Sequence, residues 1–537
     1  MFEPTTTFLC DIYLLNHVSL IALGVLLLLL FGMSRKSKNI KGTSLNGPIS
    51  PSFLFGYYRQ LTESEDDAAM YEEWAKAYGP AYVVPGGFGT KNIVICDPRA
   101  NAHFYSKETF GYVQTKLARI FIENLMGRGL LWSEGESHRR QRKALSPAFS
   151  NAAIRRLTPV FYDAAYKMTG AWNNAINAGS GQAIIDVQIW MNRISLDSIG
   201  IAGFGHDFHA LDGQESAIVQ VLESFSDEDT SILSRLVFFL GPVLPILQKL
   251  PTEQNRTVVK MKKTMRVIAD ELLERNRKAK DGQAMAEEKS IIGLLIKAES
   301  TSSSLAMSQE EILAQNVLLL AGYETTSSKA DWALIELCRQ PDKQRKLREE
   351  LAQFTTSDPT FDQLSATLPY LDAVVQEVLR LHSPVTQNTR VAAEDDVIPF
   401  TNPVTTATGE TITRLVIPKG ASVLSPISYM NRAETYWGSN AREFQPERWL
   451  EKDACKCAEE IQGYKHILTF SDGPRICLGK SFALTEFKAV LSVMIRRYSF
   501  ELPDGPDTKI TKHPSILPRP KLSTVSGPKL YLKVKAV

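Results

Sequence analysis

The sequence predicts a mainly α-helical fold with a minor β component, preceded by one N-terminal transmembrane helix. Helical periodicity prevails from about residue 100 to residue 381, with polar breaks near residues 281–289 and 355–358. Short strand-like runs lie outside this region, near residues 81–84, 91–96, 411–417 and 529–537. The last of these runs alternates as an edge strand does. The transmembrane helix is predicted from an apolar run near the N-terminus.

Residues 12–33 are almost all apolar, and about 20 such residues suffice to cross a bilayer. Four basic residues follow between positions 35 and 41, and none precedes the run. This asymmetry places the body of the protein in the cytosol, whereas a cleaved secretory signal carries its positive charge in front. The predicted division is a lumenal terminus (1–11), an anchor (12–33), a basic, proline-containing hinge (34–51) and one large domain (52–537).

Composition excludes several classes of protein. A net charge of +2 gives no argument for nucleic-acid binding, and 44% apolar residues supply ample material for a core. Six cysteines without a CxxC pair argue against zinc-ribbon and thioredoxin-like folds and fit a reducing compartment. The close pair Cys455 and Cys457 lies in a polar setting, which favours a solvated loop.

The strongest local signal is a cysteine loop at the entry to an amphipathic segment. It reads Phe470-x-x-Gly473-x-Arg475-x-Cys477-x-Gly479. A helix N-terminus favours the thiolate, which is the metal-binding form of cysteine. The two glycines permit positive φ and close approach of a flat cofactor, and the arginine can grip a carboxylate in a bidentate fashion. A buried structural cysteine is the alternative, but five fixed positions make a chance match improbable.

A second signal is a helix of about 30 residues that begins at Ser308 and closes before Pro341. Ser308 and Glu311 have the spacing of a capping box. Such a helix is roughly 45 Å long, enough to cross a whole domain.

The middle of this helix reads Ala321-Gly322-Tyr-Glu324-Thr325-Thr. A glycine inside a helix costs about 1 kcal/mol against alanine and needs a reason. Thr325 can bond back to the carbonyl of Ala321 and open a groove beside Gly322 that is large enough for dioxygen and water. A kinked core helix with a solvent-facing glutamate is the alternative.

A third signal is an ion pair in apolar surroundings. Glu377 and Arg380 lie three residues apart on one helix face, flanked by valines and leucines, so burial is predicted. A buried pair needs further hydrogen bonds to offset its desolvation, and Arg448 is the predicted third member.

Together these motifs resemble those of the cytochrome P450 family, over a stretch from about residue 44 to the end. The resemblance implies a helical haem-binding domain with small β-sheets, and haem b with Cys477 as axial ligand of its iron. It implies that Thr325 hydrogen-bonds dioxygen and that Glu324 belongs to the proton-delivery path. It also implies a set of cofactor-binding residues: Arg475, His138, Arg142, Arg390, Phe470, Gly473, Gly479, Ala321 and Gly322. His138 stands where the family usually has tryptophan, which puts that propionate contact in doubt. The family's ExxR and PERF-type motifs match Glu377, Arg380 and Arg448.

The implied activity is that of a monooxygenase in the endoplasmic-reticulum membrane, with its catalytic domain (52–537) in the cytosol. It takes electrons from an NADPH-dependent reductase, splits dioxygen and oxidises an apolar small molecule. The style of the sequence is similar to fungal members, which favours secondary metabolism and a terpenoid-like substrate over fatty-acid or xenobiotic hydroxylation. The resemblance places substrate contacts in apolar segments at residues 110–121, 225–247, 318–323, 385–387 and 515–517.

Two other functions remain open. A haem-thiolate isomerase or dehydratase needs no reductase, and Glu324 with Thr325 argues against it because such enzymes deliver no protons to oxygen. A non-catalytic haem protein needs a blocked groove, and the small pair Ala321-Gly322 argues against that.

Overall fold

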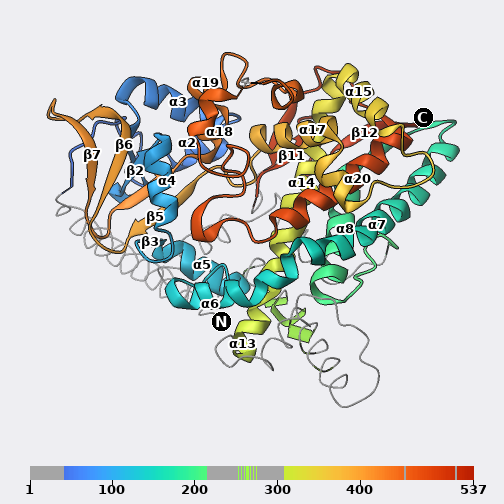
Figure 1. Ribbon diagram of the computed structural model, residues 1–537, viewed down its shortest axis with the longest axis horizontal. Coiled ribbons are helices and arrows are strands. Elements are labelled where there is room, and N and C mark those ends of the chain that lie inside the picture. The colour runs from blue at the N-terminus through green and yellow to red at the C-terminus, as the bar shows by residue number, and fades with distance from the viewer. Residues whose placement is uncertain are drawn as a thin grey trace, which may run out of the picture. The chain divides into compact units, whose positions relative to one another are not determined.

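The computed structural model (Figure 1) describes residues 42–213, 307–452, 455–513 and 517–537, with scattered residues between 252 and 274. The chain divides into two compact units. The first comprises the chain up to Ala100 together with Thr389–Pro426, and the second comprises Asn101–Asn388 and Ile427–Val537. No helix within the described ranges is long and apolar enough to cross a membrane. The predicted anchor (12–33) lies outside these ranges and stays a prediction.

The first unit is built on strands, as its alternating apolar runs predict. β1 (Ala81–Pro85) pairs antiparallel with β2 (Lys91–Ile95) across the one-turn helix η2 (Gly87–Gly89). β2 pairs parallel with β8 (Ser422–Ser425), and β5 (Asn388–Ala392) follows β8 in the sheet.

A separate antiparallel ribbon and two helices complete the first unit. The ribbon consists of β6 (Asp396–Thr405) and β7 (Thr411–Ile417). The helices are α2 (Tyr58–Glu63) and α3 (Asp67–Tyr78). The side chain of Asp66 caps α3 by accepting from the N–H of Ala69, and Gly79 is the C-cap residue after Tyr78.

The second unit is mainly helical. Its helices up to the chain break are α4 (Pro98–Ser106, which begins in the first unit), α5 (Lys116–Met126), α6 (Gly135–Leu145), η3 (Ser146–Phe149), α7 (Asn151–Ala178), α8 (Val187–Ile199) and the π-helical turn η4 (Gly200–Phe204). After the break come α13 (Gln309–Leu313), η7 (Ala314–Asn316), α14 (Val317–Arg339), α15 (Pro341–Leu351), α16 (Phe361–Ala366) and α17 (Pro369–Leu381). The last group is α18 (Ile427–Arg432), α19 (Glu434–Trp437), η8 (Pro446–Trp449), η9 (Lys456–Glu460), η10 (Gly473–Arg475) and α20 (Lys480–Arg497).

The strands of this unit are β3 (Tyr112–Gln114), β4 (Gln182–Asp186), β9 (Tyr498–Glu501), β10 (Ile510–His513), β11 (Arg519–Leu522) and β12 (Tyr531–Ala536). β10 and β11 form an antiparallel hairpin near the C-terminus. β12 lies between β4 and β9 and pairs antiparallel with both.

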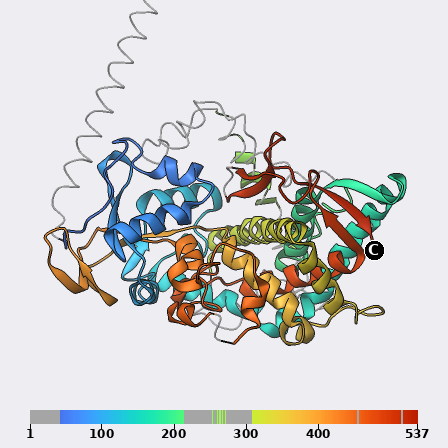
Figure 2. The ribbon, with the colours of Figure 1, turned by 90° about the horizontal axis from the view of Figure 1, so that it is seen from above.

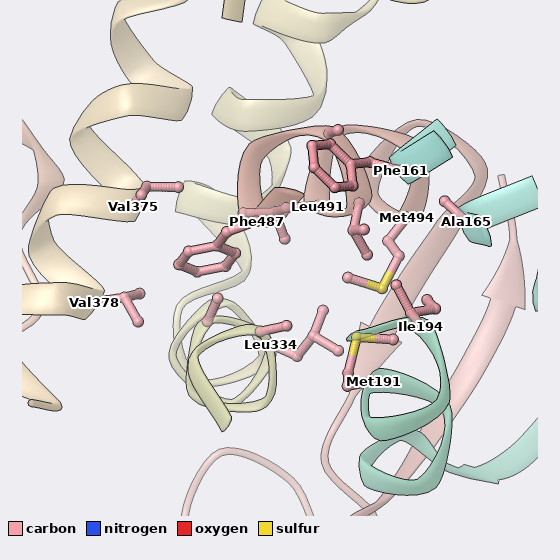
Figure 3. Close-up of a cluster of buried hydrophobic side chains, with 14 of the residues drawn as sticks. Phe161, Ala165, Met191, Ile194, Leu334, Val375, Val378, Phe487, Leu491 and Met494 are labelled. Carbon is pink, nitrogen blue, oxygen red and sulfur yellow. The ribbon is translucent and has the colours of Figure 1, made fainter. Parts of the chain in front are cut away.

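The core of this unit lies where five helices meet. α20 packs against α7, α14 and α17, and α14 packs against α8. Figure 3 shows the packing: Phe161 of α7, Met191 and Ile194 of α8, Leu334 of α14, and Phe487 and Leu491 of α20 face one another. The rings of Phe161 and Phe482 meet edge to face with centroids 4.9 Å apart. This packing holds α14 and α20, the two helices that carry the strongest motifs, in fixed relation.

The structure corrects two sequence predictions. The helix predicted from Ser308 to Pro341 is interrupted, because the 3₁₀ turn η7 separates the short α13 from α14. Figure 2 shows α14 itself as one straight rod. The capping box predicted for Ser308 and Glu311 is present, but it caps α13. β12 was expected to be an edge strand, and it is the central strand of its sheet because β4 and β9 come to it from distant parts of the chain.

Candidate active site

The cysteine loop folds back on itself before α20 begins. The N–H of Cys477 donates to the carbonyl of Phe470 at 2.8 Å, and the ring of Phe470 is buried. Ser471 adopts a positive φ of 60°. The 3₁₀ turn η10 lies between Phe470 and Cys477. The loop therefore presents Cys477 three residues ahead of the first helical residue, Lys480.

Opposing effects act on the Cys477 thiol. Its side chain is exposed, yet enough protein surrounds it that burial raises the pKa of the thiol. A hydrogen bond from the N–H of Gly479 and the positive charges of Arg142 and Lys480 lower that pKa and favour the thiolate. The loop thus offers a sulfur donor in surroundings that stabilise its anionic, metal-binding form.

The two glycines of the loop have different roles. Gly473 has a positive φ of 65°, and a Cβ there would lie 2.2 Å from the carbonyl oxygen of Tyr105, so only glycine fits. Gly479 has a φ of −84°, which any residue adopts, so the predicted positive φ is wrong at this position. Gly479 is the N-cap residue of α20, and its N–H donates a hydrogen bond to the sulfur of Cys477.

Two arginines and a histidine cluster at the loop. Arg475 donates from Nη2 to the backbone oxygen of Ser133 at 2.5 Å and pairs with Glu134. His138 and Arg142 lie one turn apart on α6, as predicted, and both interact electrostatically with Arg475. His138 is buried, and burial together with the charges of Arg475 and Arg142 lowers its pKa to about 3. The histidine is therefore neutral at physiological pH.

Arg142 supplies a positive charge that can receive an external anion. It is partly buried, and burial lowers its pKa. Within the described ranges no carboxylate forms an ion pair with it. A thiolate donor, a glycine-lined loop and an arginine without an acidic partner fit a flat, metal-containing cofactor with acidic substituents, as haem b is.

Arg390, the fourth predicted cofactor contact, belongs to the first unit. It lies on β5, and its Nη1 donates to the carbonyl of Thr389 at 3.0 Å. Its role stays a prediction.

The predicted back-bond of α14 is present. The hydroxyl of Thr325 donates to the carbonyl of Ala321 at 2.5 Å, and Ala321 is exposed. The structure gives a different reason for Gly322, however. A Cβ there would lie 3.0 Å from Cγ1 of Ile199, so a larger residue would force this side chain to shift by a few tenths of an ångström, because α8 approaches α14 closely at this point.

Glu324 has a partner that the sequence did not reveal. It is buried, and its Oε1 lies 2.9 Å from Nε of Arg519, which stands on β11. Burial raises the pKa of Glu324 above its usual value, and the charge of Arg519 opposes that shift. Arg519 is nearly two hundred residues away between two prolines, and no local pattern marks it. The glutamate is therefore not solvent-facing.

The predicted ion-pair network is confirmed and is fully buried. Arg380 grips Glu377 in a bidentate fashion, with Nε–Oε2 2.9 Å and Nη2–Oε1 2.8 Å, and both side chains are 0% exposed. Nε of Arg448 lies 2.8 Å from Oε1 of Glu377. The indole of Trp449 and the N–H of Gln445 donate to the same carboxylate at 2.9 Å. Burial would raise the pKa of Glu377, but the two arginines hold it below its usual value.

The two arginines extend the network to the chain between α18 and the cysteine loop. Arg380 also donates to the carbonyl oxygens of Asn431 and Ala441, at 3.0 and 2.5 Å. Arg448 donates to the carbonyl of Asn440 at 2.9 Å. The network therefore ties α17 to the segment that leads into the cysteine loop.

The predicted substrate segments are only partly described. Residues 225–247, and residues 515–516 of the segment 515–517, lie outside the described ranges. In the segments that are described, Phe110, Leu117 and Val385 are exposed apolar side chains.

We expect Glu377→Ala to lower the free energy of unfolding by about 3–5 kcal/mol, because two buried guanidinium groups lose their counter-charge. Thermal unfolding and the yield of folded protein measure the effect. The control is Glu349→Ala, which removes an exposed pair with Arg345 (2.8 Å) and should cost less than about 1 kcal/mol. A Glu377→Ala protein with the yield and unfolding midpoint of the wild type would contradict the role given to the network.

We expect His138 to make the fold less stable in acid. The unfolded chain takes up a proton near pH 6.5, whereas the folded protein resists protonation down to about pH 3. The contribution of His138 to the free energy of unfolding is therefore complete above pH 7, and it falls by about 2 kcal/mol as the pH drops to 5. Chemical denaturation of the wild type and of His138→Gln at pH 5 and pH 7 measures this contribution to the free energy of unfolding. Equal pH dependence in the two proteins would show that the imidazole is not held neutral.

Comparison with known proteins agrees with this geometry. The family model of cytochrome P450 matches residues 46–526. The cytochrome P450 monooxygenase claP of Ampulloclitocybe clavipes is 59% identical over 500 residues, which cover 92% of this chain and 93% of that protein. The monooxygenase claQ of the same fungus is 58% identical over 510 residues, which cover 94% and 95%. A protein named ganoderic acid synthetase, from Ganoderma lucidum, is 33% identical over 492 residues, which cover 86% and 88%. With its helical fold and small sheets, the chain belongs to the cytochrome P450 family and is a monooxygenase.

Proposed function

We propose that this chain is a membrane-anchored fungal monooxygenase that holds haem b through Cys477 and oxidises an apolar small molecule in secondary metabolism. The observation that carries the proposal is the sulfur of Cys477, set at the start of α20 beside the N–H of Gly479 and the charge of Arg142. When bound, the haem supplies the activation of dioxygen.

In this proposal the remaining site residues divide between holding the cofactor and handling protons. Arg142, Arg475 and neutral His138 hold the acidic substituents of the haem, and Arg390 is a fourth candidate. Phe470, Gly473 and Gly479 shape the loop around the sulfur. On α14, the hydroxyl of Thr325 positions dioxygen beside Ala321, and the carboxyl of Glu324 delivers protons.

Two observations support an apolar substrate in a biosynthetic reaction. Exposed Phe110, Leu117 and Val385 lie in segments expected to contact substrate. The printed name of one relative connects that protein with ganoderic acid. A terpenoid-like molecule remains the favoured substrate over a fatty acid or a xenobiotic. Electrons come from an NADPH-dependent reductase, and residues 12–33 anchor the protein in the endoplasmic-reticulum membrane with the catalytic domain in the cytosol.

The test of the proposal is a reduced, carbon-monoxide difference spectrum of the purified protein, followed by a screen of apolar ligands for a spin-state shift. The wild type should show the absorption band of thiolate-ligated haem, and Cys477→Ser should lose both that band and turnover. Cys457→Ser, which changes an exposed cysteine on η9, should behave as the wild type. Unchanged haem absorption and turnover in Cys477→Ser would refute the assignment.

We expect Thr325→Ala to consume NADPH with little product, because removing the hydroxyl leaves dioxygen poorly placed beside its proton source. Product formed per NADPH oxidised should fall on the order of tenfold or more, as loss of a positioned proton-handling group predicts. Thr326→Ala alters the next residue, a buried threonine, and should keep the wild-type ratio. An undiminished ratio in Thr325→Ala would remove that residue from its role, and turnover without NADPH and reductase would favour an isomerase or dehydratase.

A further inference from the structure

A stripe of buried polar side chains continues along α14 beyond Glu324. Ser328 follows Glu324 by four residues and Asp331 follows Ser328 by three, so all three lie on one face of the helix. Their exposed fractions are 3% for Glu324, 2% for Ser328 and 1% for Asp331. Sequence patterns assigned no role to the last two.

Both additional side chains lack hydrogen-bond partners within the described ranges. Neither carboxyl oxygen of Asp331 has one, and the hydroxyl of Ser328 has none. Polar atoms inside proteins are nearly always hydrogen-bonded, and a buried carboxylate without donors is costly. Surroundings of this kind favour the protonated, neutral form of the Asp331 carboxyl. Burial and the neighbouring Asp186 raise its pKa well above the usual value.

The groups that face Asp331 come from three elements. Asp186 is the half-buried residue at the start of α8, Arg519 stands on β11, and Lys329 lies on α14 itself. Gln188 of α8 adjoins Asp331; its Nε2 donates to the carbonyl of Pro520 at 2.9 Å, while its Oε1 has no donor. A proton on Asp331 can satisfy that oxygen. Arg519 is paired with Glu324, so the two acids share one cation.

We propose that Asp331 is a second proton carrier of this monooxygenase, which passes its proton through the hydroxyl of Ser328 to Glu324. The proposal rests on the proposed role of Glu324 in proton delivery. Oxidation of one substrate molecule consumes dioxygen, two electrons from the reductase and two protons, and it releases one water. A single buried glutamate must therefore be reloaded within each cycle.

The transfer balances without any further reactant. Glu324 loses its proton toward the oxygen side, and the resulting carboxylate is stabilised by Arg519. The O–H bond of Ser328 then breaks as the serine donates to Glu324, and a new one forms as Asp331 gives up its proton. In the structure the hydroxyl of Ser328 makes no hydrogen bond to either carboxyl, so each transfer requires this hydroxyl to rotate onto the carboxyl concerned, where it can accept and donate. Glu324 and Asp331 are about 10 Å apart along the helix axis, too far for direct transfer, and Ser328 lies between them. Solvent reloads Asp331 from the side of half-buried Asp186.

Adjacent serines provide a matched test. Ser328→Ala removes the relay, whereas Ser327→Ala removes an equally buried hydroxyl that donates to the backbone oxygen of Glu324 at 3.3 Å. With the reductase present, product per NADPH should fall at least about tenfold in Ser328→Ala and the solvent deuterium isotope effect should change. Ser327→Ala should match the wild type in both. Wild-type coupling and isotope effect in Ser328→Ala would overturn the proposal.

The proton on Asp331 can be detected without turnover. The infrared difference spectrum of wild type minus Asp331→Asn at pH 7 should contain a carboxylic-acid C=O band that shifts in deuterium oxide, whereas the bands of Glu324 and of the buried Glu486 are common to both proteins and cancel. Asp197→Asn should retain this band; Asp197 lies on α8, is just as buried, and accepts from the N–H groups of Ala210 and Leu211 at 3.0 Å. If Asp331→Asn fails to fold, the Ser328→Ala measurement still decides. A difference spectrum of wild type minus Asp331→Asn without this band would overturn the proposal, whereas a wild type without haem absorption would refute the proposed function instead.

Discussion

The carboxylate of Glu377, buried between two arginines, is the interaction on which the rest of the second unit depends. Arg380 and Arg448 neutralise it, and the indole of Trp449 completes its hydrogen bonds. The same arginines bind backbone carbonyls of the chain that runs from α18 toward the cysteine loop. A buried ion pair adds little net stability, but breaking it is expensive. The network therefore fixes geometry, because every alternative path of this chain leaves a charge unpaired.

Within that fixed geometry, opposing effects act on the pKa of the Cys477 thiol. Burial disfavours the thiolate, while the N–H of Gly479 and the charges of Arg142 and Lys480 favour it. Gly473 makes the loop possible, since no side chain fits beside the carbonyl of Tyr105. His138 stays neutral because it is buried and because Arg475 and Arg142 already supply positive charge there. Substitution of histidine for the family's tryptophan thus adds no further cation.

α14 joins two kinds of chemistry on one helix. At Thr325 and Ala321 the helix bonds back on itself and exposes backbone, and at Gly322 it lets α8 approach closely. The face that carries Glu324 packs instead against α8 and the C-terminal hairpin, where Arg519 is the counter-ion of Glu324. The buried acidic face of the helix is therefore assembled from three segments that are far apart in sequence. Its polar atoms are buried, so their protonation depends on those neighbours and not on solvent.

The sequence alone determined the features that depend on local chemistry. A capping box, a glycine that must adopt positive φ, a cysteine before a helix and an ion pair at helical spacing are each written within a few residues. The family resemblance joined these motifs into one site. Only the tertiary structure decided what distant contacts control: Arg519 as partner of Glu324, Ile199 as the reason for Gly322, the η7 interruption before α14, and β12 as a central strand. Such contacts depend on how elements far apart in the sequence pack together, and no local sequence pattern predicts that packing.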